Sequence, residues 1–306
     1  MSDITTGPTS TGPTSAGLGF PAREAEALVR TALDEDLGPD DLDVTTLATF
    51  DAQATCRAEV VARADGVVAG LPVVGVVFRA VAARLGLPEP AVTVSASDGD
   101  RVARGEVLAT VEGRTQVLLI GERTMLNILS RLSGVATHTR RWADALEGTG
   151  CTVLDTRKTT PGMRALEKYA VRAGGGTNKR MGLYDTAMVK DNHKLAAGSL
   201  TAAYRTIRER FPDVPVQVEV TTVEEALEAV RMGARFVMCD NMPVDLLRQT
   251  VEALRGTGEQ VEVEATGGLT LDVARDYADT GIDYLSVGGL THSSPILDIA
   301  LDLTDA

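Results

Sequence analysis

The chain has 306 residues, of which 44% are hydrophobic, and a formal net charge of −13. This length suffices for two domains, or for one barrel with an appended domain. The acidic charge argues against nucleic acid or an anionic membrane as the main partner. The longest apolar run, at 67–78, is too short for a bilayer span of about 20 residues. No secretory signal opens the chain and the three cysteines are far apart, so we predict a cytoplasmic protein with reduced thiols.

The first part of the chain predicts a short tail followed by a mixed α/β region. Residues 1–20 repeat T-G-P-T-S and carry almost no charge, which predicts a disordered tail. Apolar residues recur at helical spacing from Pro21 to about Gly38. The expected elements that follow are strands at 56–64 and 66–69, a helix at 73–85, a strand–turn pattern at 91–112 and a helix at 118–131.

After Gly150 the pattern alternates between strand and helix. The six apolar strands are expected at 151–155, 186–190, 215–220, 235–239, 260–265 and 283–287. Helical stretches are expected at 198–211, 222–233, 243–255 and 270–281. This alternation predicts a parallel sheet, and the number of units favours a β/α barrel. Eight strands would close such a barrel, so we expect an incomplete barrel or one with a strand that the pattern does not reveal.

Positive charge gathers in one stretch of this second part. All five lysines of the chain lie between Lys158 and Lys194. The stretch 157–194 holds nine Lys/Arg and three Asp/Glu, a net charge of 9 − 3 = +6 in a protein of net −13. A basic pocket in an acidic protein indicates a small ligand with several negative charges.

Polar residues and glycine pairs follow the predicted strands at their carboxyl ends, the edge that carries the active site of a β/α barrel. The cations are Arg157, Lys158, Lys179, Arg180 and Lys190, and the two acids are Glu219 and Asp240. The acids suit Mg²⁺ or ribose hydroxyls. The pairs Gly267–Gly268 and Gly288–Gly289 would let backbone amides approach a phosphate closely. Together these residues predict a site for a phosphorylated sugar donor and a dianionic acceptor.

An ordered set of motifs resembles the quinolinate phosphoribosyltransferase family. The motifs are D-T-R-K-T-T-P-G at 155–162, K-Y-A-V-R-A-G-G-G-T-N-K-R-M-G-L-Y-D at 168–185, K-D-N-H at 190–193, V-E-V at 218–220, D-N-M at 240–242, E-A-T-G-G-L at 264–269 and S-V-G-G-L-T-H-S at 286–293. A-L-D-E-D-L-G at 32–38 and G-E-R-T-M-L-N at 121–127 match as well. The resemblance covers roughly residues 22–302.

The resemblance implies an N-terminal α/β sandwich domain and a C-terminal open α/β barrel of seven strands. We place the domains at 21–126 with 293–306 and at 127–292. The implied reaction transfers phosphoribose from phosphoribosyl pyrophosphate to quinolinate with Mg²⁺, giving nicotinate mononucleotide, CO₂ and pyrophosphate. A homodimer is implied, with a higher oligomer as the open alternative. No nucleic-acid or membrane partner is expected.

The resemblance also implies a role for each site residue. Arg157, Arg180 and Lys190 would hold the quinolinate carboxylates, joined by Arg123 from the partner subunit. Lys158 would face the donor, and Glu219 and Asp240 would hold ribose hydroxyls or metal. The 5′-phosphate would lie on Thr266, Gly267, Gly268, Gly288 and Gly289. Lys179 stands where the family commonly has histidine, which leaves its role open.

Three alternatives remain at this point. A Schiff-base aldolase would also use a strand-end lysine such as Lys190, but in apolar surroundings. A relative associated with molybdenum transport would share the fold, and a nicotinate phosphoribosyltransferase would need fewer cations. Outside the predicted site, we expect Lys168 and Lys194 on solvated helical faces, Tyr169 and Tyr184 in packing contacts and His138 in a structural role.

Overall fold

The structure, a computed structural model, describes residues 18–304 and divides the chain into two compact units. One unit contains the described residues up to Ala136 and those from Leu297 on, and the other is Thr137–Ile296. The boundaries predicted from the sequence lie after residues 126 and 292. Of the predicted tail, residues 1–17 lie outside the described part, and the prediction is wrong at Leu18, which is buried.

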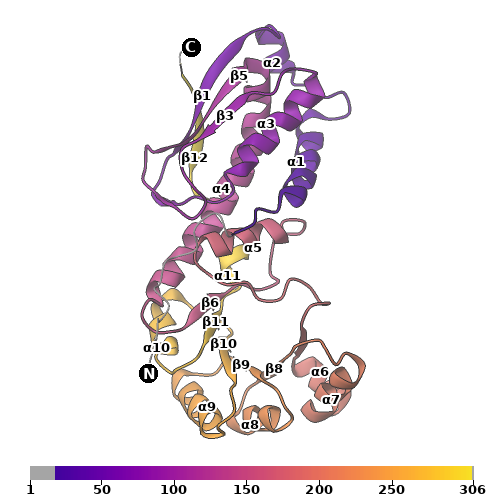
Figure 1. Cartoon of the computed structure of the whole chain (residues 1–306), viewed down its shortest axis with the longest axis vertical. Helices are drawn as coiled ribbons and strands as arrows, with labels where there is room; N and C mark the ends of the chain where they lie inside the picture. Colours follow the sequence, from indigo (N-terminus) through magenta and orange to yellow (C-terminus); the bar gives the residue numbers. More distant parts are fainter. Residues whose placement is uncertain (1–17, 305–306) are drawn as a thin grey trace, which may run out of the picture. The chain divides into compact units, whose positions relative to one another are not determined.

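The first unit is built on a four-stranded antiparallel sheet (Figure 1). Its order is β12 (Ile299–Thr304), β1 (Thr55–Ala62), β5 (Val107–Arg114) and β3 (Ala91–Val94). The C-terminal strand β12 pairs with β1, so the end of the chain completes the N-terminal sheet. A separate short pair joins β2 (Gly66–Val67) to β4 (Arg101–Val102).

Four helices complete this unit. They are α1 (Ala22–Leu37), α2 (Val44–Thr49), α3 (Pro72–Leu85) and the part of α4 (Thr115–Ala145) up to Ala136. Helix α1 buries Ala25, Val29, Leu33 and Leu37, a stripe at helical spacing. Gly121 of α4 allows close approach to α3, because a Cβ there would lie 2.8 Å from the ring of Phe78. These contacts give the mixed α/β domain that the sequence predicts.

Helix α4 runs well past its predicted end at residue 131. No proline interrupts it, and a lone glycine such as Gly134 costs only about 1 kcal/mol inside a helix. The helix therefore continues through the division between the two units. None of the helices in the described residues combines the length and the apolar composition that a membrane crossing requires.

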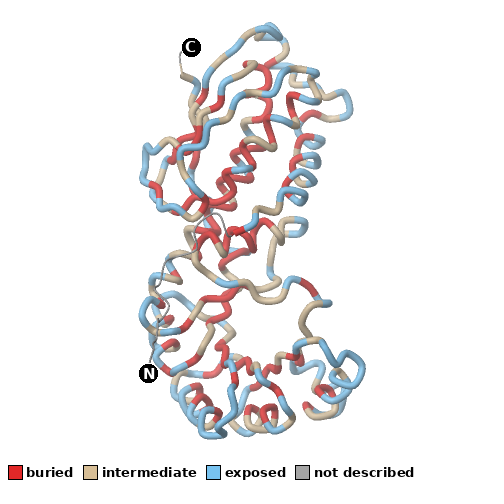
Figure 2. The backbone as a smooth tube through the Cα atoms, in the orientation of Figure 1, coloured by how far each residue is buried: buried red, intermediate tan, exposed pale blue. Residues whose placement is uncertain are grey.

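The second unit is a six-stranded parallel sheet with helices on its outer side (Figure 1). The strands lie in the order β6 (Thr152–Leu154), β11 (Tyr284–Ser286), β10 (Glu262–Thr266), β9 (Phe236–Asp240), β8 (Val216–Val220) and β7 (Ala187–Val189). All six predicted strands are present. Valine or leucine residues with little or no exposure lie in all six strands, among them Val153, Val189, Val218, Val237, Val263 and Leu285, as expected of a parallel sheet covered on both faces. Figure 2 shows this burial along the strands, with exposed residues on the outer faces of α8 and α9.

Helices connect these strands. They are α5 (Arg164–Ala173), α6 (Asp191–Ala197), α7 (Leu200–Arg210), α8 (Val223–Arg231), α9 (Val244–Gly256), α10 (Ala274–Ala278) and α11 (Gly289–His292), with a 3₁₀ turn at Leu271–Val273. Thr222 caps α8 by accepting from the N–H of Glu225, and Ser199 caps α7 in the same way. Such side-chain caps fix where each helix starts after its strand.

The barrel is open between β6 and β7, the two edge strands of the sheet. A seventh strand, which the resemblance implies, is represented in the described residues by one parallel bridge between Leu154 and Thr177. The segment after Thr177 then leaves the sheet and carries Asn178, Lys179 and Arg180. Because the barrel is open here, Lys179 and Arg180 lie beside the ends of the strands and are not part of a strand in a closed barrel.

Candidate active site

The carboxyl ends of the parallel strands open on a cavity of about 1000 Å³ in the second unit, here called the strand-end cavity. Every predicted site residue of this unit lines it: Arg157, Lys158, Lys179, Arg180, Lys190, Glu219, Asp240, Thr266, Gly267, Gly268, Gly288 and Gly289. Arg123 does not belong to this set, because it lies on α4 in the first unit, where it is exposed. The ends of six strands thus bring together residues that are up to 132 positions apart, counted from Arg157 to Gly289.

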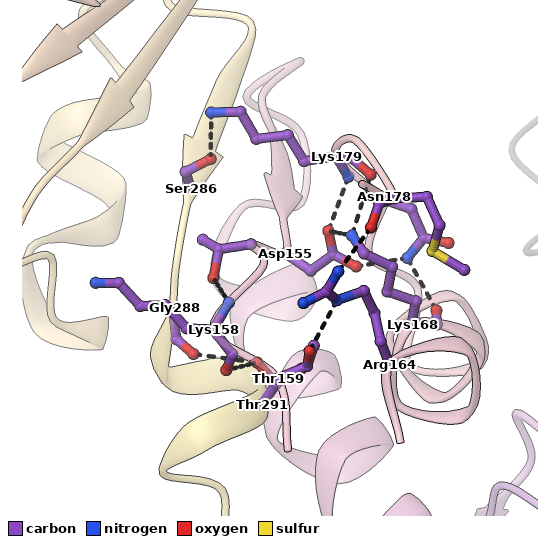
Figure 3. Close-up of polar contacts among 12 residues, drawn as sticks. Asp155, Lys158, Thr159, Arg164, Lys168, Asn178, Lys179, Ser286, Gly288 and Thr291 are labelled. Atoms are coloured by element: carbon purple, nitrogen blue, oxygen red, sulfur yellow. Dashed lines mark hydrogen bonds and ion pairs between the residues drawn. The ribbon is translucent and has the colours of Figure 1, made fainter. Parts of the chain in front are cut away.

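The loop after β6 holds Lys158 at the rim (Figure 3). The backbone N–H of Lys158 donates to Thr156 Oγ1 at 3.0 Å, and its carbonyl accepts from Thr291 Oγ1 at 2.8 Å. Gly288 leaves room for the lysine stem, because a Cβ at that position would lie 2.8 Å from Lys158 Cδ. The loop after β11 therefore supports the loop after β6, and the ammonium group of Lys158 stays exposed.

A buried ion pair fixes the opening of the barrel (Figure 3). Lys168 Nζ lies 2.5 Å from Asp155 Oδ1, and both side chains are almost fully buried. Asp155 also accepts from the Asn178 amide and from the Lys179 backbone N–H, each at 2.8 Å. Burial raises the pKa of Asp155 and lowers the pKa of Lys168, while their mutual attraction opposes both shifts. The prediction of a solvated Lys168 is wrong, because α5 turns this residue inward.

Two of the cations come from the segment that this ion pair anchors. Lys179 Nζ lies 2.6 Å from Glu264 Oε1 and 3.1 Å from Met238 Sδ. Burial lowers the pKa of Lys179, and the adjacent Glu264 carboxylate opposes that shift. Arg180 donates to the carbonyl of Thr186 at 2.8 Å, and burial, with the nearby Arg157 charge, lowers its pKa.

Arg157 has a donor with no partner. Its Nε is buried and makes no hydrogen bond to any residue that the structure describes. A buried guanidinium N–H is costly to leave unpaired. Arg157 and Arg180 line the same cavity, so this unpaired donor belongs to a residue of the strand-end cavity.

The two predicted acids lie at the ends of neighbouring strands. Glu219 of β8 forms an ion pair with Lys190, which begins α6, and Asp240 of β9 accepts from the Asn241 amide at 2.8 Å. His193 supports Lys190 by accepting from its backbone N–H at 3.0 Å. No group of three or more His, Cys, Asp or Glu within residues 18–304 is arranged to hold a metal. The site therefore supplies two carboxylates, which suits Mg²⁺ completed by water and phosphate oxygens.

The turn after β10 places backbone amides at the cavity. Gly267 has φ +97°, and a Cβ there would clash with Asn241 Oδ1. Asn241 itself has φ +52° and donates its backbone N–H to the Thr266 carbonyl at 2.9 Å. Only glycine fits at Gly267, because a side chain would be strained and would also clash. The turn therefore leaves peptide groups open to an anion.

Sequence reasoning missed several cavity residues. His138 and Trp142 of α4 line the cavity, with Trp142 Nε1 donating to His138 Nε2 at 3.3 Å. Burial lowers the pKa of His138, which favours the neutral imidazole. His138 was expected to have a structural role, but it also lines the strand-end cavity. Residues four positions apart lie on the same face of a helix, so the spacing of His138 and Trp142 could have indicated in the sequence that they lie together.

Two predictions outside the cavity are corrected in part. Tyr184 does not pack, being 77% exposed, whereas Tyr169 is buried as expected. Lys194 is mostly covered instead of solvated, because its ammonium group contacts Asp191 and Glu225.

A second cavity, of about 1050 Å³, opens at the other end of the sheet. It contains Gln217, Phe236, Glu262 and Tyr284 from the amino-terminal halves of strands, with Arg205 and Arg208 of α7 at its edge. Neither the acid pair nor the glycine pairs line it. Lys179 and Arg180 line both cavities, whereas Arg157, Lys158, Lys190, the two acids and the glycine pairs line only the strand-end cavity of the two.

Comparisons with known proteins cover both units. The N-terminal domain of quinolinate phosphoribosyl transferase matches residues 43–133, and the C-terminal domain matches residues 135–302. A nicotinate-nucleotide pyrophosphorylase [carboxylating] of Mycobacterium leprae is 44% identical over 279 residues, 91% of this chain and 97% of that protein. A probable enzyme of the same name from Bacillus subtilis is 42% identical, over 88% of this chain and 90% of its own length.

Solved structures agree in fold. The nicotinate-nucleotide pyrophosphorylase structure from Francisella tularensis superimposes with a TM-score of 0.87 at 30% identity, covering 94% of this chain and 98% of that one. The comparisons give no support to a relative associated with molybdenum transport.

Proposed function

The chain belongs to the quinolinate phosphoribosyltransferase family, and from this premise we propose that the strand-end cavity is its active site. The reaction transfers phosphoribose from phosphoribosyl pyrophosphate to quinolinate, with loss of CO₂, and gives nicotinate mononucleotide and pyrophosphate. The chain is therefore an enzyme of NAD biosynthesis. The observation that carries the assignment of the site is the buried Arg157 donor without a partner, in a cavity shared with Arg180 and Lys190.

The acceptor subsite is formed by three cations. Arg157 and Arg180 offer guanidinium forks that suit carboxylates, and Lys190 adds a compact charge beside Glu219. Two carboxylates on adjacent carbons of the pyridine ring would engage these groups at once. A single carboxylate would leave one fork unpaired in a partly desolvated cavity, so the arrangement favours quinolinate over nicotinate.

The donor subsite takes the other half of the cavity. Exposed Lys158 would contact the pyrophosphate, and the turns at Thr266–Gly268 and Gly288–Gly289 would receive the 5′-phosphate on backbone amides. Glu219 and Asp240 would lie beside the ribose between these groups. Glu219, Asp240 and Lys190 are held by contacts within the protein before substrate arrives, so little reorganisation of these groups is needed during the reaction.

Magnesium is the proposed cofactor, held through Glu219 and Asp240 and completed by substrate oxygens and water. When bound, it would neutralise charge on the pyrophosphate leaving group. The protein contributes only two carboxylates, which fits a metal that arrives with the donor. The ion pair between Lys190 and Glu219 also means that metal or ribose would compete with Lys190 for that carboxylate.

The chain's residues can then support the chemistry in two stages. The pyridine nitrogen is a weak nucleophile, so the bond to pyrophosphate breaks early and leaves positive charge on the ribose. Glu219 and Asp240 would stabilise this charge, and Lys158 would stabilise the departing anion. After the nitrogen joins the ribose, the ring is cationic, and the bond between C2 and its carboxylate breaks: CO₂ departs, the electron pair stays on C2, and C2 takes a proton from water. No covalent bond to the enzyme is required.

A homodimer would complete the acceptor subsite. Arg123 is exposed on α4 of the first unit and does not line the cavity of its own chain. We assign it to the cavity of a partner subunit, where it would add a further cation for quinolinate. The cytoplasm is the proposed location.

The test is product formation from quinolinate, phosphoribosyl pyrophosphate and Mg²⁺, with nicotinate as a parallel acceptor. We expect nicotinate mononucleotide and CO₂ in equal amounts from quinolinate and negligible product from nicotinate. Turnover with nicotinate alone would contradict the acceptor assignment. A Schiff-base reaction at Lys190 is disfavoured because that lysine is paired with Glu219 among other cations, and borohydride should trap no adduct.

A further inference from the structure

We propose that Glu264 is a positioning residue for the acceptor: its buried carboxylate holds the ammonium group of Lys179 at the floor of the strand-end cavity and cancels its charge. This inference rests on the proposed function of the cavity. It assigns a role to Glu264, and it explains how a lysine can occupy the floor among several other cations.

The contacts around Lys179 are one-sided. Its ammonium group lies 2.6 Å from Glu264 Oε1, 3.1 Å from Met238 Sδ and 3.5 Å from Ser286 Oγ, all on the sheet side. The side chain of Lys179 is 8% exposed and that of Glu264 is 0% exposed. Figure 3 shows the lysine extending from the anchored segment to Ser286 on β11. The pair is therefore internal to the barrel, with Lys179 on the cavity side.

Glu264 is only half satisfied. Its second oxygen, Oε2, is buried and makes no hydrogen bond to a residue in the described range. A carboxylate buried for stability alone would be expected to have both oxygens paired, since an unpaired buried acceptor costs about 1–3 kcal/mol. The unpaired oxygen makes Glu264 less favourable for stability, which fits a residue whose role is to hold Lys179 in one place.

Charge balance explains why the carboxylate is needed. The charged or titratable groups that face Lys179 and Glu264 come from several elements: Lys190 before α6, Arg180 on the same segment, Cys239 on β9 and Asp155 on β6 through the Lys179 backbone. Without Glu264, Lys179 would be a buried cation beside Lys190 and Arg180. With it, the floor is neutral overall, and the net charge for a dianionic acceptor comes from Arg157 and Arg180.

The anchored backbone makes the position of this pair definite. The N–H of Lys179 donates to Asp155 and its carbonyl accepts from Lys168 Nζ at 3.0 Å. Its main chain is thus fixed from one side and its ammonium group from the other. Of the three contacts of its ammonium group, those to Met238 Sδ and to Ser286 Oγ at 3.5 Å are weak, so Lys179 can redirect one N–H to an acceptor carboxylate with little movement.

The experiment compares Glu264→Gln with wild type in steady-state kinetics and in calorimetric titration with quinolinate. Glutamine keeps the shape but leaves the Lys179 cation unpaired among like charges, so the amine loses its proton and becomes a poor donor to a carboxylate. We expect the quinolinate KM to rise about tenfold, the cost of one charged hydrogen bond, with the KM for phosphoribosyl pyrophosphate almost unchanged. The ratio of variant to wild-type KM should shrink as the pH is lowered from 8.5 to 6.5, because protonation restores the donor.

The matched control is Glu262→Gln, two residues earlier on β10. Glu262 accepts from the Tyr284 hydroxyl at 2.8 Å and lines only the other cavity, so the same chemical change should leave both KM values unaltered. If Glu264→Gln does not fold, the double variant Lys179→Met with Glu264→Gln removes the unpaired charge. It should bind quinolinate weakly at every pH.

The outcomes separate the two levels of the proposal. Wild-type turnover of quinolinate with an unchanged or lower quinolinate KM in Glu264→Gln would overturn the positioning role alone. Normal quinolinate affinity in the double variant would do the same. A wild-type enzyme that neither binds nor converts quinolinate would overturn the proposed function together with this inference.

Discussion

The second unit contains two buried lysine–carboxylate pairs that differ in how fully they are satisfied. Lys168 and Asp155 lie away from the strand-end cavity, and Asp155 accepts hydrogen bonds at both oxygens. Lys179 and Glu264 lie at the cavity floor, and one oxygen of Glu264 has no partner among the described residues. Similar chemistry thus has two uses. The complete pair fixes the chain, and the incomplete pair holds the Lys179 ammonium group at the cavity that we assign to the acceptor.

The largest expected effect comes from breaking the complete pair. Lys168→Met would leave Asp155 as a buried charge without its partner, and removing one member of a buried ion pair costs about 3–5 kcal/mol. The free energy of unfolding in urea should fall by that amount. The double variant Lys168→Met with Asp155→Leu should recover part of the loss, and a stability equal to wild type in Lys168→Met would show that the pair does not anchor the segment.

The second prediction breaks the incomplete pair. Lys179→Met should lower kcat/KM for quinolinate about 10- to 100-fold, because a charged donor to the acceptor is lost. Its effect on the free energy of unfolding should be smaller than that of Lys168→Met, since Lys168 also donates to the Lys179 carbonyl and so helps to hold the segment. The control is Lys194→Met, which removes a lysine that contacts Asp191 and Glu225 outside the cavity. Equal kinetic losses in the two variants would contradict the distinction between the pairs.

These two lysines also show what the sequence could and could not predict. Strand positions followed from apolar runs, and the strand-end residues of the second unit followed from the rule that parallel strands place their carboxyl ends together. Lys168 was predicted on a solvated face because a lysine on the buried face of a helix is rare. Its burial is possible only because it pairs with Asp155, a contact that the sequence does not reveal. His138 and Trp142 were missed because α4 was expected to end before them.

A third prediction concerns the donor side of the cavity. Gly267→Ala would force a side chain into a backbone at φ +97° and toward Asn241 Oδ1. Such strain costs about 1–3 kcal/mol. We expect a KM for phosphoribosyl pyrophosphate several times higher, with the quinolinate KM nearly constant. Gly258→Ala, also at positive φ but with open space around it, is the matched control for strain alone. The same donor KM in both variants would argue against a phosphate role for the turn.

The smallest effect is expected from thiol reagents. Burial raises the pKa of Cys151 and of Cys239 to about 12, and the Glu264 carboxylate adds to the shift at Cys239. Both thiols are therefore protonated and covered at pH 8, and a thiol reagent should label only Cys56 in the native protein. Activity should be almost unchanged after labelling. Fast labelling of Cys239 would mean that the region around Glu264 opens to solvent.

The central claim is that the strand-end cavity binds the acceptor through its cations, and calorimetric titration of quinolinate into Arg157→Met tests it most directly. Truncating one partner of a desolvated charge pair costs about 2–5 kcal/mol, so the dissociation constant should rise at least about 30-fold. The control Arg231→Met, on the last turn of α8, should bind like wild type. Equal affinity in Arg157→Met and wild type would contradict the account and place the acceptor elsewhere.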